Sequence, residues 1–164
     1  MRIFAVSGYS GTGKTSLVEK IIRSLVGSGH TVASIKSSKH KAGPDKGKDT
    51  QRHQQAGASM TIFLSPSSTS TSIKDRIEPE EWAKLTDFDF LIVEGMKSAN
   101  IPKFWCVGEA AIEPKDVPIN TQAIVSWFDK EVNCQENIPI ISSDKIEKLV
   151  EIVKLRSVDI SVIE

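Results

Sequence analysis

The segment that most constrains the fold lies near the start of the chain and reads Gly8-Tyr9-Ser10-Gly11-Thr12-Gly13-Lys14-Thr15. It fits the pattern G-x-x-x-x-G-K-[ST], which forms a phosphate-binding loop when a strand precedes it and a helix follows it. Residues 2–7 predict a strand, and its apolar run 3–6 suits burial on both faces. Residues 14–26 repeat apolar side chains at helical spacing, and glycines follow them. The sequence therefore predicts a P-loop between a buried strand and an amphipathic helix.

The residue types of this loop suit a polyphosphate. Glycines let the backbone curl so that several N–H groups point into one concavity, and the first turn of the helix adds unpaired donors. The Lys14 ammonium would contact the β- and γ-phosphates, and the Thr15 hydroxyl would reach Mg²⁺. We therefore expect residues Gly8 to Ser16 to bind a nucleotide or a similar phosphate compound. The alternative is a glycine-rich turn that matches the pattern by chance.

The rest of the chain alternates apolar runs with helical patterns, which is typical of an α/β fold with a mainly parallel sheet flanked by helices. The predicted strands are 31–36, 60–64, 88–93, 103–107, 123–126 and 139–141. Helices are predicted at 49–58, from Pro79 onward, and from Asp144, which with Glu147 resembles a capping box. The Ser/Thr-rich segment 65–72 predicts an exposed loop. With no long linker, residues 1–164 are expected to form a single nucleotide-binding domain.

The formal net charge is zero, but the charges are unevenly distributed along the chain. Residues 1–60 hold ten basic and three acidic residues, whereas residues 61–164 hold eleven basic and eighteen acidic ones. Segment 36–53 alone has six basic and two acidic residues. This excess suits an anionic ligand near the P-loop, with room for a second anionic group beside the nucleotide. A solvated basic loop is the other reading of segment 36–53.

A P-loop needs an acidic partner on another strand, to hold a metal ion or orient water. Glu94 follows the apolar run 90–93, at the strand end where open parallel sheets bind ligands. Asp49 lies after the second predicted strand and is the second candidate, whereas Asp89 begins its strand and should lie away from the site. We expect Lys14, Asp49 and Glu94 to be catalytic and Thr15, Asp49 and Glu94 to bind the metal. A strand-end carboxylate in a surface ion pair is the alternative for Glu94.

Several other classes of site find little support. Cys106 lies in an apolar run and reads as a small buried hydrophobe; a disulfide with Cys134 is conceivable but unnecessary at this chain length. His40 and His53 lack partners at zinc spacing, so phosphate contacts or plain surface positions are expected for them. Aromatic residues make up 6% of the chain and do not alternate with the lysines, which disfavours nucleic acid. No long apolar segment predicts a membrane span or signal peptide, so the cytoplasm is expected.

Several strings together make the sequence resemble the MobB family of P-loop proteins associated with molybdopterin-guanine dinucleotide biosynthesis. Besides the P-loop, they are Ser34-Ile35-Lys36 with His40, Gly47-Lys48-Asp49-Thr50-Gln51-Arg52 with Ala56-Gly57-Ala58, Val93-Glu94-Gly95-Met96-Lys97, and Pro102-Lys103. They cover roughly residues 1–107. Many relatives have Gly-Phe-Lys where this chain has Gly95-Met96-Lys97, and residues 108–164 add little to the match.

The resemblance implies a Mg²⁺-dependent GTP-binding accessory protein with slow GTP hydrolysis. Such a protein assists the molybdenum-cofactor guanylyltransferase that joins GMP to molybdopterin, in a molybdenum or tungsten pathway, and family members are similar in being dimeric. By position, Lys14, Thr15, Asp49 and Glu94 would serve phosphate and metal, and Arg52 and Lys97 would lie near the ligand. Direct binding of molybdopterin is left open.

Two other readings remain. The chain could be a P-loop kinase that phosphorylates an anionic metabolite, but the arginine-bearing lid of such kinases has little counterpart, because Arg156 is the only arginine after residue 107. It could also be a nucleotide-dependent switch without useful turnover. No Asn-Lys-x-Asp string is present, so the sequence chemistry alone does not distinguish GTP from ATP.

Overall fold

The strands of the described residues, nine in number, form one sheet at the centre of the molecule, in the order β4-β3-β2-β5-β1-β6-β7-β8, with β9 paired to β1. The computed structural model describes residues 1–39, 48–75, 87–108, 114–127 and 138–163. The strands are β1 (Arg2–Gly8), β2 (Val32–Ser37), β3 (Met60–Ser65), β4 (Ser68–Ile73), β5 (Phe90–Glu94), β6 (Lys103–Val107), β7 (Thr121–Ser126), β8 (Ile140–Ser142) and β9 (Val158–Asp159). All pairs are parallel except β3 with β4 and β1 with β9. The predicted α/β fold with a mainly parallel sheet is confirmed.

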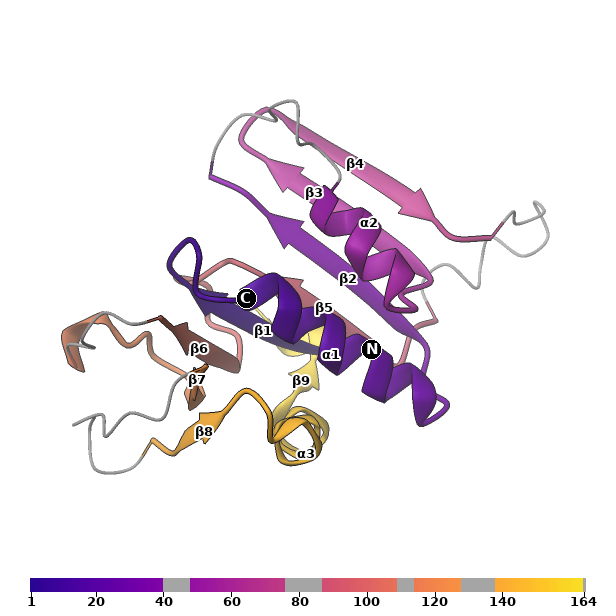
Figure 1. Cartoon of the computed structure of the whole chain (residues 1–164). Coiled ribbons are helices and arrows are strands. Elements are labelled where there is room, and N and C mark those ends of the chain that lie inside the picture. Colours follow the sequence, from indigo (N-terminus) through magenta and orange to yellow (C-terminus); the bar gives the residue numbers. More distant parts are fainter. Residues whose placement is uncertain (40–47, 76–86, 109–113, 128–137, 164) are drawn as a thin grey trace.

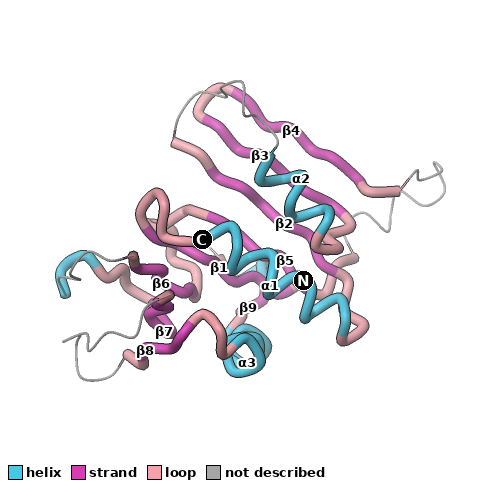
Figure 2. The backbone as a smooth tube through the Cα atoms, in the orientation of Figure 1, coloured by secondary structure: helices cyan, strands magenta, loops and turns pink. Residues whose placement is uncertain are grey.

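The three described α-helices are α1 (Lys14–Gly27), α2 (Lys48–Gln55) and α3 (Ile146–Arg156). Two short 3-10 turns are also described: η2 (Pro114–Asp116) lies between β6 and β7, and η3 (Ile160–Val162) follows β9. Helix α1 lies across the middle strands with α2 on one side and α3 on the other (Figure 1). In Figure 2 the loop from β1 into α1 is seen at the end of β1, at the carboxyl edge of the sheet. This is the edge where parallel sheets place their ligands.

The middle of strand β1, residues 3–6, is apolar and is buried on both faces of the sheet. Phe4 and Val6 pack with Leu17 and Ile21 of α1 in the larger core cluster. Ile3 and Ala5 alternate with them and belong to a second cluster on the opposite face of the sheet. Successive strand side chains point to opposite faces, so each residue contributes to the core on its own side. The predicted strand buried on both faces is therefore confirmed.

The register of three neighbouring strands brings polar side chains to one point. Lys36 of β2 is aligned with Glu94 of β5, and Glu94 is aligned with Val6 of β1. Val6 packs into the core beneath the helices, and Ile92, two residues before Glu94, does the same. Because side chains alternate along a strand, Glu94 and Lys36 therefore lie on the helix-covered face, level with the end of β1 that leads into the P-loop. Topology alone thus places a carboxylate and an ammonium beside the start of α1.

Two local predictions are wrong. Segment 65–72 is not a loop, because β4 (Ser68–Ile73) pairs antiparallel with β3 across a two-residue turn at 66–67. The alternating threonines favour a strand, and the Ser65 hydroxyl stabilises the turn by donating to the Ser68 carbonyl at 3.0 Å. The segment is mostly exposed, as expected.

The second error concerns the start of α3. Asp144 does not cap it: Lys145 is the N-cap and makes no side-chain capping bond, and the Asp144 carboxylate lies 3.6 Å from the Lys20 ammonium instead. The attraction of Lys20 for this exposed carboxylate therefore competes with capping.

Several expectations concern other parts of the chain. The predicted helix from Pro79, His40 and Cys134 lie outside the described residues. Cys106 is confirmed as a buried free thiol in β6, and burial raises its pKa to about 12. Among the described helices, none is both long and apolar enough to cross a bilayer.

Asp89 lies at the amino end of β5, away from the P-loop, as the sequence predicts. Its Oδ2 accepts hydrogen bonds from the Thr31 backbone N–H at 2.8 Å and from the Thr31 hydroxyl at 3.0 Å. These bonds lower the pKa of Asp89. The residue therefore stabilises the junction of β2 and β5 at the edge opposite the P-loop.

We expect Asp89→Ala to lower the free energy of unfolding by about 1 kcal/mol, because two hydrogen bonds to an exposed carboxylate are lost. Urea titration measures this change. Affinity for a nucleotide should be unchanged, because the residue is remote from the P-loop. A large loss of nucleotide affinity in a folded Asp89→Ala protein would contradict this placement.

Candidate nucleotide-binding site

The P-loop backbone has the shape that its glycines permit. Gly11 and Gly13 both have φ of 77°, in the left-handed region that favours glycine. A Cβ on Gly8 would lie 2.4 Å from the Cys106 carbonyl oxygen, so the loop passes too close to β6 for a side chain there. The Thr12 hydroxyl donates to the Tyr9 carbonyl at 2.8 Å and fastens the two halves of the loop. The loop is therefore curled before any ligand arrives.

Lys14 begins α1 and folds back over the loop, where its ammonium donates to the Tyr9 carbonyl. Burial lowers the pKa of Lys14, although the Glu94 carboxylate opposes this effect. An ammonium that is partly stripped of water gains more from a phosphate than from a backbone carbonyl. Lys14 is thus close to the loop and able to exchange its carbonyl partner for an anion.

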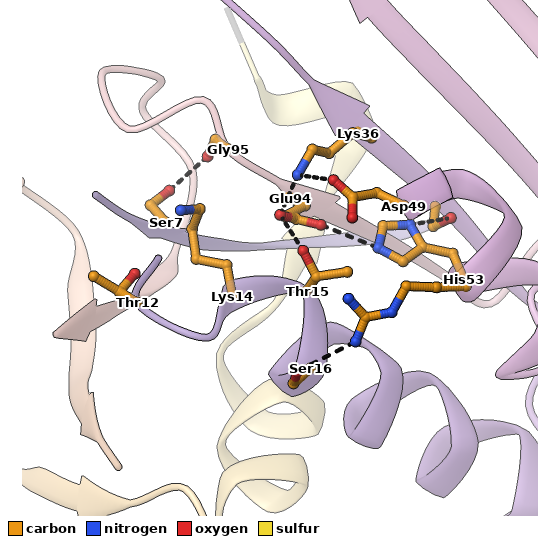
Figure 3. Close-up of polar contacts among 12 residues, drawn as sticks. Ser7, Thr12, Lys14, Thr15, Ser16, Lys36, Asp49, His53, Glu94 and Gly95 are labelled. Carbon is orange, nitrogen blue, oxygen red and sulfur yellow. Dashed lines mark hydrogen bonds and ion pairs between the residues drawn. The ribbon is translucent and has the colours of Figure 1, made fainter. Parts of the chain in front are cut away.

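Glu94 is the centre of the polar network beside the loop, and its side chain is only 1% exposed. Its Oε1 accepts the Thr15 hydroxyl at 2.9 Å and also pairs with the Lys36 ammonium (Figure 3). Its Oε2 lies 3.2 Å from His53 Nε2. Burial alone would raise the pKa of Glu94, but the hydrogen bond from His53 and the charge of Lys36 lower it to about 2. Glu94 is therefore ionised across the physiological range.

Lys36 joins the two predicted acidic residues. Its ammonium contacts the Glu94 carboxylate and lies 2.6 Å from Asp49 Oδ2, at the start of α2 (Figure 3). Burial alone would lower the pKa of Lys36, yet the two carboxylates raise it. The structure thus brings Asp49 and Glu94 together, as predicted. The bridge between them is Lys36, a residue of the basic segment 36–53 whose bridging role the sequence does not predict.

The residues at this point suit a Mg²⁺ ion that is shared with a phosphate. Mg²⁺ is usually held by one or two protein oxygens, together with water and phosphate oxygens. The Thr15 hydroxyl and the Glu94 carboxylate lie together at the start of α1, and Asp49 is one lysine away. The described residues include no cluster of three or more His, Cys, Asp or Glu side chains able to hold a metal. The donor set therefore fits a metal that arrives with its nucleotide.

His53 was expected to contact phosphate or lie at the surface, and this expectation is wrong. Its ring is fully buried between Glu94 and Ser34, with Nδ1 3.1 Å from the Ser34 hydroxyl. A proton on Nε2 would be donated to Glu94, and Nδ1 would then accept from Ser34. The signal in the sequence is spacing: His53 lies four residues after Asp49, so both occupy one face of α2.

Two hollows flank β1 at the P-loop and share no lining residue. The larger, about 680 Å³, is lined by Gly8, Tyr9, Ser10 and Lys14 together with residues 36–39 and 95–99. The smaller, about 250 Å³, is lined by Gly11, Thr12, Gly13, Ser16 and Trp127. Because β5 and β2 lie on one side of β1 and β6 and β7 on the other, the hollows open to opposite sides of the loop.

Trp127, directly after β7, forms the wall of the smaller hollow and was not predicted to have a role there. Its indole Nε1 donates to the Thr12 carbonyl at 3.0 Å, and a Cβ on Gly13 would lie only 2.1 Å from that nitrogen. The Lys20 ammonium lies 4.8 Å from the ring centroid. Trp127 could be anticipated only from the topology, because β7 ends at the same sheet edge as β1.

The two remaining predicted ligand contacts differ in position. Arg52 donates to the Ser16 hydroxyl at 3.3 Å and forms an ion pair with Glu19, so it lies along α1 and lines neither hollow. Lys97 lines the larger hollow, with its ammonium 5.2 Å from the centroid of the Tyr9 ring. Lys97 is thus placed for a ligand, whereas Arg52 braces α2 against α1.

We expect His53→Ala to lower the free energy of unfolding by about 2–4 kcal/mol, because it leaves a cavity and two buried polar groups without a partner. His53→Gln keeps a side-chain donor near Glu94 and should recover part of this loss. Urea unfolding of both variants measures the effect. Equal losses in the two would contradict a hydrogen-bonding role for this ring.

The depressed pKa of Glu94 predicts a pH dependence. In the unfolded chain the carboxyl titrates near 4.5, whereas in the folded protein its pKa is about 2. The stability contributed by the ionised form is therefore complete above pH 4.5 and is lost progressively as the pH falls towards 2. The difference in unfolding free energy between the parent chain and Glu94→Gln should shrink below pH 4.5. A difference that stays constant from pH 7 to 3 would contradict this.

Comparisons with known proteins agree with the motifs. The MobB family model, described as molybdopterin guanine dinucleotide synthesis protein B, matches residues 3–128. A putative molybdopterin-guanine dinucleotide biosynthesis adapter protein of Methanocaldococcus jannaschii is 40% identical over 111 residues, which are 63% of this chain and 46% of that protein. The adapter protein of Haemophilus influenzae is 36% identical over 62% of this chain and 60% of its own length. The chain thus spans about half of the length of these two relatives.

Longer alignments extend the likeness over most of the chain. The Escherichia coli adapter protein is 29% identical over 160 residues, 92% of this chain and 90% of that protein. The crystal structure of Bacillus subtilis MobB superimposes with a TM-score of 0.62 at 24% identity, covering 96% of this chain and 99% of that one. HypB of Helicobacter pylori, solved in complex with nickel, has the same fold at a TM-score of 0.59 and 14% identity, covering 96% of this chain and 89% of that one. Since the family model matches well over half of its residues, this chain belongs to the MobB family.

Proposed function

We propose that this chain is a Mg²⁺-dependent GTP-binding adapter that assists the attachment of GMP to molybdopterin in the biosynthesis of a molybdenum or tungsten cofactor. The observation that carries the nucleotide part is the hydrogen bond between Thr15 and Glu94, 2.9 Å long, at the mouth of the curled P-loop. A hydroxyl and a buried carboxylate beside a phosphate-binding backbone form the usual surroundings of a metal–triphosphate. The adapter role is taken from the names of the relatives.

The surroundings of the loop support one direction for the proposed nucleotide. Lys14, Thr15 and Glu94 lie on the β5 side, so the terminal phosphate and the metal belong there. Ser16 and Trp127 line the smaller hollow on the other side, which leaves that hollow for the nucleoside end. Bound Mg²⁺ would neutralise phosphate charge, and Thr15, Glu94 and Asp49 are the residues that would hold it.

The geometry favours slow turnover. An arginine aimed at the terminal phosphate accelerates nucleotide hydrolysis by orders of magnitude. In the part of the chain that the structure describes, no arginine lines either hollow, and Arg52 is paired with Glu19. The lysines that line the larger hollow can attract an anion, but they are not arginines aimed at the terminal phosphate. We therefore propose a GTPase that is weak when alone, and this argues against the alternative of a small-molecule kinase.

The remaining parts of the proposal concern partners. The relatives named as adapters imply a partner enzyme, and we propose the molybdenum-cofactor guanylyltransferase as that partner. We also propose a homodimer in the cytoplasm, without nucleic acid. The preference for GTP over ATP is part of the proposal and is carried by the family alone.

We expect Lys14→Ala to weaken binding of a fluorescent GTP analogue about 10- to 100-fold, because a charge-assisted contact to phosphate is lost. Fluorescence titration in Mg²⁺ measures the affinity. Lys148→Ala, which removes an exposed lysine of α3, is the matched control and should bind as the parent chain does. Equal affinity in the parent and Lys14→Ala proteins would overturn the nucleotide site.

The same preparations test the adapter role. Phosphate release from GTP should be slow for the chain alone, and the chain should stimulate dinucleotide formation by the guanylyltransferase with molybdopterin and GTP. Lys14→Ala should lose this stimulation. Rapid multiple-turnover phosphorylation of an unrelated metabolite would replace the adapter proposal by the kinase alternative.

A further inference from the structure

Lys36 places an ammonium group at the point where the proposed metal ligands converge. Its Nζ lies 2.6 Å from Asp49 Oδ2 and pairs with Glu94 Oε1 (Figure 3). The same Glu94 oxygen accepts the Thr15 hydroxyl at 2.9 Å. All three side chains proposed for Mg²⁺ are therefore gathered around one lysine. A divalent cation bound to these oxygens would lie within a few ångströms of the ammonium, where two positive charges repel each other strongly.

The ammonium of Lys36 also stands towards the larger hollow. Lys36 lines this hollow together with Gly8 and Lys14 of the P-loop, whereas neither Glu94 nor Asp49 lines it. The Lys36 side chain is 18% exposed, and that of Glu94 is 1% exposed. The hollow thus presents an ammonium, and not the carboxylates, to a ligand that enters it.

The charges around Lys36 favour one form of the metal over another. Lys36 and Lys14 stand against Glu94 and Asp49, and the charges of Lys14 and Glu94 are close enough to interact. Mg²⁺ alone would add positive charge beside two ammonium groups, and it gives up its water reluctantly. A Mg²⁺–triphosphate complex carries a net negative charge and offers phosphate oxygens to both lysines. The cluster therefore favours a metal that arrives as this complex over a free metal ion.

Lys36 can leave the carboxylates without any movement of its strand. It lies near the carboxyl end of β2, in register with Glu94. Lysine carries its charge on a flexible stem, so rotation of the side chain alone can turn the ammonium to another acceptor. The hollow that Lys36 lines is the one proposed above for the terminal phosphate. Glu94 Oε2 keeps its contact with His53, so the oxygen that Lys36 gives up is Oε1, beside Thr15.

We propose that Lys36 makes metal binding depend on the triphosphate. It holds Glu94 and Asp49 against a free divalent cation and releases them when its ammonium turns to the terminal phosphate of the nucleotide. A diphosphate has no phosphate at that position and leaves Lys36 on the carboxylates. Lys36 is thus a specificity-determining residue for the metal triphosphate. The inference deepens the proposed function and rests on it for the position of the terminal phosphate, whereas competition between Lys36 and a free cation involves no nucleotide.

The first test measures this competition in the full chain without nucleotide. Mn²⁺ takes the place of Mg²⁺, because electron paramagnetic resonance distinguishes the free ion from the bound one. We expect Lys36→Gln to bind Mn²⁺ at least tenfold more tightly than the parent chain, because the competing charge is removed. Addition of Asp49→Asn to Lys36→Gln should abolish this gain. Lys148→Gln, which removes an exposed lysine of α3, is the charge-matched control and should bind Mn²⁺ as the parent does.

Two results of these titrations would overturn the proposal: equal Mn²⁺ affinities in the parent and Lys36→Gln proteins, or a gain that survives the Asp49→Asn change. The removal of a charge beside buried Glu94 can also unfold the variant. A second test therefore uses the parent chain alone.

This second test follows the ¹³Cε NMR signal of Lys36, assigned by its loss in Lys36→Arg. The signal should shift when Mg²⁺ and guanosine 5′-(β,γ-imido)triphosphate are added together, stay in place with Mg²⁺ alone, and move far less with Mg²⁺ and GDP. A shift with Mg²⁺ alone, an equally large shift with GDP, or no shift with the bound triphosphate analogue would contradict the role of Lys36. Failure of the proposed function is distinguishable, because the analogue would then not bind the parent chain, and the Mn²⁺ titrations would still decide whether Lys36 competes with a metal.

Discussion

The Glu94 carboxylate is held by groups from three other elements: the Thr15 hydroxyl of α1, the Lys36 ammonium of β2 and the His53 ring of α2. A buried carboxylate is costly unless it is paired and fully hydrogen-bonded, and each of these groups supplies part of that compensation. The arrangement ties the helix that follows the P-loop to the strand beside it. Removal of Lys36 would leave the buried carboxylate without its counter-charge, and removal of Thr15 or His53 would leave it short of a hydrogen bond. The position of α2, and with it Asp49, depends on the same carboxylate.

Much of this arrangement could be predicted because it follows from local patterns. The P-loop is a contiguous string with a strand before it and a helix after it, and Glu94 ends an apolar run, so both were placed correctly at one sheet edge. The fold class follows from the alternation of strands and helices, which shows in the order of apolar runs and helical patterns along the sequence. Asp49 and Glu94 were expected to meet, and they do, because parallel strands end at a common edge.

The parts that were missed depend on contacts between distant segments. His53 is polar and lies in a basic segment, so only the fold reveals that Ser34 and Glu94 enclose it. Lys103 is buried in a strand where a lysine is unexpected, and the carbonyls that it satisfies belong to a turn before it. Trp127 contacts Thr12 of the P-loop, although more than a hundred residues separate the two in the sequence. The serine- and threonine-rich β4 was read as a loop because composition outweighed the alternation that forms an edge strand.

The two hollows share the P-loop but no residue, and they open on opposite sides of β1. In the orientation proposed above, one nucleotide would reach into both hollows, with its terminal phosphate in the larger and its nucleoside end in the smaller. A partner protein that covered either opening would therefore hold back release of the same nucleotide. The P-loop thus lines both hollows and separates them.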